Sequence, residues 1–228
     1  MTLRFTTLAL CCTAALAACS PQPAASDNHA ASAVAAAASE AGSVTIDTAR
    51  GEATVPANPE RIAVYDWGML DTLGKLGVDV GATTTNIRLG YLQDAARNMQ
   101  PVGTLFEPDY EAHHAFAPQL IITGSRTAPA FEQLSKLAPT IEMTADTTKM
   151  RESTEARIDA FAKIFHKEAE AQALKKEIDE SFAAAKAAAQ GKGSGLVILV
   201  NGGKMSAFGP DSRFGWIHRD VGVPTVDA

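Results

Sequence analysis

Cysteine is nearly absent from this chain: Cys11, Cys12 and Cys19 are the only three among 228 residues, and all lie in the first twenty positions. The body of the chain therefore has neither thiolate chemistry nor a disulfide of its own. It also lacks a later run of roughly eighteen consecutive apolar residues, so nothing in the body is expected to span a membrane. The formal net charge of -6 argues against a surface for nucleic acid or anionic lipid.

Motifs of enzyme chemistry are missing as well. The sequence has no P-loop, no HExxH and no Gly-x-Ser-x-Gly. The glycines of residues 191–195 precede a strand instead of following one, so we interpret them as a helix stop and not as a dinucleotide site. His113 and His114 face different directions on a helix without a partner at ligand spacing, and are interpreted as surface histidines. Asp66 and Asp71 do not share a helix face. We expect neither an enzyme nor a metal site.

The first 42 residues predict an export signal, a lipid anchor and a tether. Residues 1–18 form a short apolar run typical of a signal peptide. The segment Leu16-Ala17-Ala18-Cys19 resembles the bacterial lipobox, which implies cleavage before Cys19 and acylation of its sulfur. The alternative is an ordinary signal peptide cut near Ala18. Residues 19–42 are rich in Ala and Ser and cannot bury a core, so we expect a lipidated cysteine followed by a flexible tether.

Strand and helix patterns alternate over residues 43–166 and predict an N-terminal α/β lobe. Apolar and polar residues alternate in Ser43–Pro56 on either side of a turn, which indicates a β-hairpin. Arg61–Tyr65 is a short apolar strand, and Asp66 is the expected N-cap of the next helix. The alternation continues to a helix at Met150–Phe165 and predicts a parallel sheet covered on both faces. Ligands of such sheets bind outside the carboxyl ends of the strands.

One long helix is expected over residues 167–190, which contain no Gly or Pro and many Ala, Glu and Lys. A buried stripe is predicted at positions three or four apart: Ala171, Leu174, Ile178, Phe182 and Ala185. At about 1.5 Å per residue the helix would run about 36 Å. We interpret it as a strut between two lobes. Residues 191–228 would then begin a C-terminal α/β lobe that is too short to be complete.

Three arginines lie in loops expected at the mouth of the sheets: Arg88, Arg126 and Arg213. Arginine suits a planar or delocalised anion because its guanidinium presents a fixed fork of donors. On position alone, Arg88 is better explained as an ordinary surface arginine. The choice between a surface residue and a ligand-binding residue stays open for Arg126 and Arg213.

Several stretches together resemble a known family. They are PANPERIAVY at residues 56–65, PDYE at residues 108–111 and SAFGPDSRFGWIH at residues 206–218. With the lipobox, they are similar to the periplasmic iron–siderophore-binding lipoproteins of ABC importers, and most of all to the branch that binds catecholate siderophores such as ferric enterobactin. The resemblance implies two α/β lobes joined by one long helix, with the ligand between the lobes.

The resemblance also implies roles for individual residues. Arg126 and Arg213 match cleft arginines of the two lobes, and Glu111 matches the surface glutamate that docks on the membrane permease. Arg88 is carried as a further candidate for ligand binding. The implied partners are a ferric siderophore, an ABC permease and, through the lipid on Cys19, the periplasmic face of a bacterial membrane. A monomer is expected, with no cofactor besides the lipid and no bound nucleic acid.

One departure from the family bears on function. A third cleft arginine, and in the catecholate branch an iron-binding histidine and tyrosine, would correspond to positions beyond Ala228, and His218 does not match that histidine. We therefore expect an incomplete second lobe and weak binding, or none, of a ferric tris-catecholate. The alternative function is a surface or structural lipoprotein of the same ancestry that binds no ligand.

The lipobox gives a first prediction. Because acyl chains anchor a protein through buried methylene groups, Cys19→Ala should abolish incorporation of labelled palmitate and release the protein from membranes. Fractionation of cells grown with labelled palmitate measures both effects, and Cys12→Ala is the matched control. Labelling that persists in Cys19→Ala would show that the anchor lies elsewhere.

Overall fold

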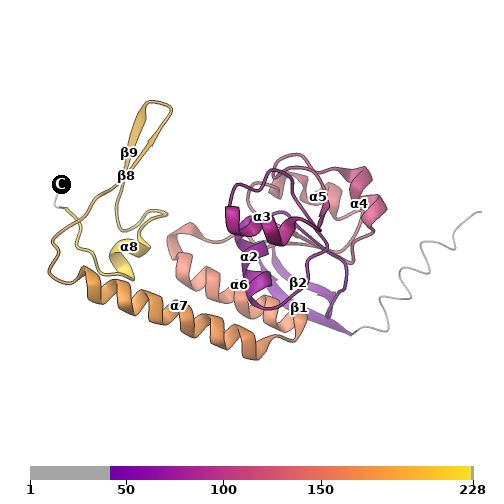
Figure 1. The fold of residues 1–228 in the computed structure, drawn as a ribbon, viewed down its shortest axis with the longest axis horizontal. Coiled ribbons are helices and arrows are strands. Elements are labelled where there is room, and N and C mark those ends of the chain that lie inside the picture. Colours follow the sequence, from indigo (N-terminus) through magenta and orange to yellow (C-terminus); the bar gives the residue numbers. More distant parts are fainter. Residues whose placement is uncertain (1–41, 227–228) are drawn as a thin grey trace, which may run out of the picture.

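The computed structural model describes residues 42–226. It has an α/β lobe, the long helix α7 (Glu168–Ala189), and a smaller unit at the far end of that helix (Figure 1). The α/β arrangement expected from the sequence is confirmed. No helix within residues 42–226 is long and apolar enough to cross a membrane.

The lobe is built on a five-stranded parallel sheet with the order β5-β4-β3-β6-β7. Its strands are β3 (Ile62–Val64), β4 (Ala82–Thr83), β5 (Gln100–Pro101), β6 (Leu120–Thr123) and β7 (Thr140–Glu142). Ala63 of the central strand pairs with Ala82 on one side and Ile121 on the other. Since all pairs are parallel, the carboxyl ends of the strands share one edge of the sheet.

Helices cover both faces of this sheet, as the alternation predicted. They are α2 (Trp67–Lys75), α3 (Gly90–Ala96), α4 (Tyr110–Phe116), α5 (Phe131–Leu134) and α6 (Met150–Phe165), with 3₁₀ turns η1 (Ala128–Ala130) and η2 (Thr147–Lys149). Ile62 and Val64 join one buried cluster with residues of α2 and α6, whereas Ala63 and Tyr65 join a second cluster on the opposite face. Alternate residues of one strand thus serve two cores, which is why the strand is apolar throughout.

A β-hairpin packs beside the lobe, as expected from its alternating pattern. Strands β1 (Ser43–Thr48) and β2 (Gly51–Pro56) pair antiparallel, and Gly51 turns the chain with a φ of 97°. Ile46 and Val55 are buried against the core. The opposite face of the hairpin is solvated, so each strand needs apolar residues only at every second position.

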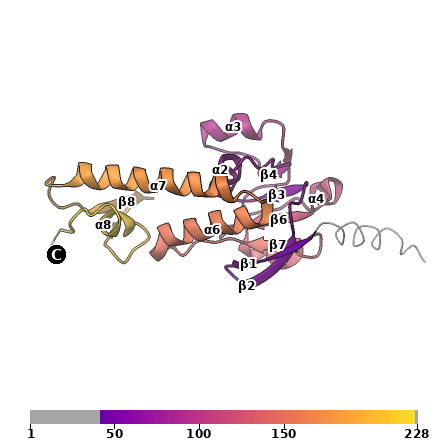
Figure 2. The same cartoon turned by 90° about the horizontal axis from the view of Figure 1, so that it is seen from below.

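Helix α7 lies alongside α6 and then continues beyond it, as both views show (Figure 2). Ala171 is buried, and Leu174, Ile178 and Phe182 are half-buried, but Ala185 is exposed. The predicted stripe is therefore wrong at its distal end. There α7 has passed the end of α6, and the smaller unit covers it only in part.

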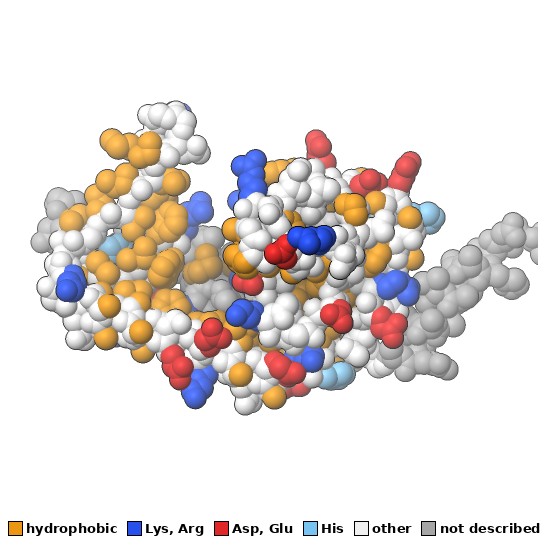
Figure 3. Space-filling view, viewed as in Figure 1, with side chains coloured by type: hydrophobic (Ala, Val, Ile, Leu, Met, Phe, Trp, Pro, Cys, Tyr) orange, Lys and Arg blue, Asp and Glu red, His pale blue; other side chains and the backbone are white. Residues whose placement is uncertain are grey.

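The smaller unit consists of a hairpin and a short helix. Strands β8 (Val197–Asn201) and β9 (Lys204–Phe208) pair antiparallel, and α8 (Trp216–Arg219) packs on α7. Large apolar side chains of the hairpin are exposed, including Val200 and Met205. Apolar surface accordingly gathers over this end of the molecule (Figure 3). Within the described residues, the hairpin is a two-stranded sheet without a covering layer.

One sequence interpretation fails in the lobe: His113 is fully buried and is not a surface histidine. Its Nε2 lies 2.5 Å from the Tyr65 hydroxyl, which donates to the Val102 carbonyl at 2.7 Å. Nε2 therefore carries the proton, because the single hydroxyl proton is already committed to Val102. Burial lowers the pKa of His113 to about 4, and burial likewise raises the pKa of Tyr65.

This pair predicts a pH dependence of folding. His113 binds a proton near pH 6.5 in the unfolded chain but only near pH 4 in the fold, so its contribution is complete above about pH 6.5 and is lost as the pH falls towards 4. The free energy of unfolding should drop by up to roughly 3 kcal/mol across that window. His113→Phe should flatten the drop in urea titrations, whereas the exposed-site control His114→Gln should not. An unchanged drop in His113→Phe would assign it to other groups.

Candidate functional site

The carboxyl edge of the sheet carries two of the three predicted arginines. Arg88 lies in the loop between β4 and α3, and Arg126 lies in the turn between β6 and η1. Strands β4 and β6 flank the central β3, so the two loops leave the same edge of the sheet. Both side chains are exposed. The structure thus places these arginines at the same end of one lobe.

These arginines also lack partners. Among residues 42–226, the guanidinium groups of Arg88, Arg126 and Arg213 make no hydrogen bond or ion pair, whereas every other arginine makes at least one. Arg213 only lies over the ring of its neighbour Phe214, 4.9 Å from the centroid. Free guanidinium forks can accept an anion without first breaking an internal contact.

A loop with an exposed aromatic residue is joined to the Arg126 turn, and the sequence analysis did not single it out. Phe106, in the loop between β5 and α4, is 69% exposed. The hydroxyl of Thr127 donates to the carbonyl of Leu105 at 2.7 Å, which joins the Phe106 loop to the Arg126 turn. An exposed aromatic residue after a strand end was the available signal. Together, the two loops present a flat apolar ring and a cation.

Asp66 lies at the base of this edge and contacts both the start of α2 and the Arg126 turn. Asp66 accepts a hydrogen bond from Met69 N at 3.0 Å and so caps α2, as predicted. A Cβ on Gly124 would lie 3.0 Å from the Asp66 carboxylate, so Gly124 leaves room for it. Burial lowers the pKa of Arg157 on α6, and the charge of Asp66 opposes that shift. The carboxylate is thus directed at internal groups.

A polar hollow accompanies the loop that carries Arg88. It has a volume of about 400 Å³ and is lined in part by the hydroxyl residues Thr83, Thr84 and Thr85. Thr84 accepts a hydrogen bond from the indole of Trp67 at 2.9 Å. The indole is therefore attached to the carboxyl edge, where its fluorescence can report on a bound ligand.

Arg213 lies in the other unit, in the segment between β9 and α8, and is exposed. The segment is held next to the first lobe by its neighbours. Trp216 packs edge-on against Phe182 of α7 with ring centroids 6.0 Å apart, and Arg219 donates to the Thr148 carbonyl of η2. The structure therefore ties the loop of Arg213 to the lobe that bears Arg126, although it shows no contact between the two arginines.

The remaining predicted residues lie apart from the arginines. Glu111 is exposed in the first turn of α4, where Asp109 caps the helix by accepting from Ala112 N at 2.9 Å. Its side chain faces solvent, as a docking residue requires. Cys19 lies outside the described residues. Within those residues, no group of three or more His, Cys, Asp or Glu side chains could hold a metal ion.

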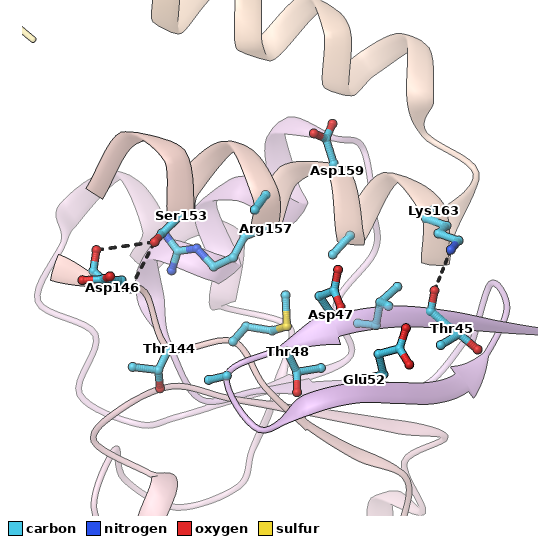
Figure 4. Close-up of a pocket in the computed structure, with 15 residues that line it drawn as sticks. Thr45, Asp47, Thr48, Glu52, Thr144, Asp146, Ser153, Arg157, Asp159 and Lys163 are labelled. Carbon is cyan, nitrogen blue, oxygen red and sulfur yellow. Dashed lines mark hydrogen bonds between the residues drawn. The ribbon is translucent and has the colours of Figure 1, made fainter. Parts of the chain in front are cut away.

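A larger cavity of about 610 Å³ lies elsewhere, between β1 and α6 (Figure 4). None of the three predicted arginines lines it. Three of its charged groups have partners: Lys163 donates to the Thr45 carbonyl at 2.6 Å, Asp159 pairs with Lys175 at 2.5 Å, and Asp146 caps η2. Size alone does not make this cavity the site, because it lacks the unpartnered arginines.

The structure has a sheet edge of one unit that faces solvent, a second unit on a connecting helix, and arginines without partners on both. Residues 62–228 match the family described as "Periplasmic binding protein", and the chain belongs to that family. Such proteins bind solutes and are not enzymes. The sequence analysis likewise found no nucleophile that could be paired with a base.

Two named relatives are similar to this chain over most of its length. The petrobactin-binding protein YclQ of Bacillus subtilis is 40% identical over 177 residues, which are 76% of this chain and 56% of that protein. The ferric-anguibactin-binding protein FatB of Vibrio anguillarum is 27% identical over 190 residues, which are 79% of this chain and 58% of that protein. The chain thus spans somewhat more than half the length of these relatives.

Solved structures show the same fold. The crystal structure of YclQ matches with a TM-score of 0.77 and 38% identity over 82% of this chain and 67% of that one. The periplasmic catecholate-siderophore-binding protein VctP of Vibrio cholerae matches with a TM-score of 0.73 and 29% identity over 82% of this chain and 68% of that one.

Proposed function

We propose that this chain is the solute-binding component of an ABC importer and captures a ferric siderophore outside the cytoplasmic membrane. The observation that carries the proposal is the set of unpartnered arginines, Arg88 and Arg126 on one lobe and Arg213 on the other. Relatives named for petrobactin and anguibactin support the ligand class. In this proposal residues 43–166 are the first lobe, residues 167–190 connect the lobes, and residues 191–228 belong to the second.

We further propose that the ligand is a ferric siderophore of the catecholate type. A ferric tris-catecholate is strongly anionic and presents flat aromatic faces, which suit guanidinium groups and an exposed ring such as Phe106. Two unit charges about 7 Å apart at an effective dielectric constant near 20 interact by roughly 2 kcal/mol. Several arginines can therefore select a charged ferric complex over a neutral one. The name of VctP as a catecholate binder supports this choice.

We also propose where the protein is held and how it delivers its ligand. Acylated Cys19 holds the protein at the periplasmic face of a bacterial membrane, and residues 20–42 give it reach. The protein acts as a monomer and presents Glu111 to the permease. The exposed position of Glu111 on α4 supports that role, since a docking carboxylate has to be accessible.

Ligand binding is tested by tryptophan fluorescence. Ferric enterobactin should bind weakly, as expected above, and should quench Trp67 and Trp216. Arg126→Ala should weaken that binding further, roughly thirtyfold for a contact of about 2 kcal/mol. Arg61→Ala, which removes an arginine bound to the Ala117 carbonyl at the opposite edge, should leave affinity unchanged.

A ferric hydroxamate lacks the negative charge and should bind weakly to every variant. Equal losses for both ligands in Arg126→Ala would contradict a charge-selective site. No quenching by either ferric complex would favour the alternative of a lipoprotein that binds no siderophore.

Permease docking gives a separate prediction. Glu111→Ala should leave siderophore affinity within about 0.5 kcal/mol, because exposed changes away from a site rarely matter more. Uptake of ⁵⁵Fe-siderophore by cells should nevertheless fall, because the permease loses a charged contact. Glu60→Ala, another exposed carboxylate, is the control and should transport normally. A large loss of affinity with normal transport per bound ligand would place Glu111 in the binding site instead.

A further inference from the structure

The β1–β2 hairpin lies outside the segment that matches the family, which begins at residue 62. Its turn nevertheless reaches the carboxyl edge of the sheet. Ala49 N donates to the carbonyl of Glu142, the last residue of β7, at 2.9 Å. The next residue, Arg50, extends from this turn towards η1 and α5. The hairpin therefore adds a side chain to the end of the lobe where ligands of parallel sheets bind.

Arg50 neutralises a buried carboxylate. Glu142 is 8% exposed, and its Oε2 accepts from Arg50 Nε at 2.6 Å. The other oxygen, Oε1, accepts from the Thr144 hydroxyl at 2.8 Å. A buried carboxylate needs such partners because its charge is costly to remove from water. This contact fixes Nε of Arg50 and thereby the orientation of the planar guanidinium group.

The other guanidinium atoms of Arg50 contact the segment that follows Arg126. Its NH2 nitrogen donates to the Ala128 carbonyl at 3.4 Å, and its carbon lies 4.1 Å from the centroid of the Phe131 ring. A guanidinium can hold a carboxylate, a carbonyl and an aromatic face at once because its donors are fixed in one plane. An ammonium group has no such plane.

The segment from Gly124 to Ala130 has few other supports. Thr127 N donates to Gly124 O at 3.0 Å and Ala130 N donates to Thr127 O at 2.9 Å, which closes two successive turns. Thr127 Oγ1 ties one side to the Leu105 carbonyl. Arg50 holds the other side. Since the Arg126 guanidinium makes no hydrogen bond or ion pair of its own within residues 42–226, its position depends on these supports.

We propose that Arg50 is a positioning residue for Arg126: by holding Ala128 and Phe131 from the hairpin turn, it fixes the loop that presents the ligand-binding cation. The proposal rests on the proposed function of Arg126. It gives the hairpin a part in ligand affinity, beyond covering the core.

Amide hydrogen exchange tests the positioning without any ligand. In the full chain, Arg50→Ala should raise exchange at the Thr127 and Ala130 amides about tenfold, as expected for losing one charge-assisted hydrogen bond. Arg50→Lys keeps a cation beside Glu142 but loses the planar fork. It should raise exchange at the same amides while core amides of β3 and β6 stay as in the parent.

The matched control is Arg61→Ala, which removes an arginine–carbonyl contact at the opposite edge of the sheet. It should leave the Thr127 and Ala130 amides unchanged. The proposal is overturned if both Arg50 variants match this control. It is also overturned if loop exchange rises only in step with core exchange, because that is the behaviour of a merely destabilised lobe.

A double-mutant cycle with ferric enterobactin links the loop to affinity. Arg50→Lys should weaken binding several-fold in the parent chain but should have no effect when Arg126→Ala is already present. Additive losses would overturn the proposal. If the parent chain binds no ferric siderophore, the proposed function fails, and the exchange data alone then decide whether Arg50 positions the loop.

Discussion

The parallel pairing of β3 with both β4 and β6 is the constraint on which the rest of the lobe depends. Ala63 is in register with Ala82 on one side and with Ile121 on the other, and all three are fully buried. Since the sheet cannot slip by one residue without exchanging its two cores, the register is fixed by the packing on both faces. The same register brings the loops after β4 and β6 to one edge, so the arrangement of Arg88 and Arg126 follows from packing far beneath them.

The second constraint is the contact between α6 and α7, which relates the two units. Arg151 on α6 bonds Asp179 on α7 and lies 5.0 Å from the centroid of Phe182, while Lys175 pairs with Asp159. Trp216 then packs on the same Phe182. Partly exposed ion pairs contribute little energy individually, but here they fix the rotation of α7 about its axis. That rotation sets the direction from which the segment of Arg213 returns to the first lobe.

Local patterns predicted much of this architecture. The hairpin, the cap of α2 by Asp66, the alternating strands and the long helix all follow from short-range preferences that packing reinforced. The burial of His113 did not follow, because it requires Tyr65, which is 48 residues away in sequence, to lie against it in the fold. Nor did the exposure of Ala185, since helical periodicity predicts a face but not the length of the partner that covers it. Phe106 was not singled out because only the hydrogen bond between Thr127 and Leu105 brings its loop to the Arg126 turn.

The arginines of this chain divide according to what surrounds them. Arg50 and Arg151 face carboxylates, and Arg157 lies desolvated near Asp66. Buried or partly buried cations of this kind are needed by the fold, because without them the carboxylate partner would remain as an uncompensated charge. Arg88, Arg126 and Arg213 sit instead in exposed loops at strand ends, without a carboxylate within ion-pair distance among the described residues. A cation that the fold does not use remains available to an anion from outside, and in our proposal Arg50 holds the loop that displays Arg126. In the proposed function, the capacity to bind a charged ligand therefore comes from the difference between these two sets of arginines and not from net charge, which is negative.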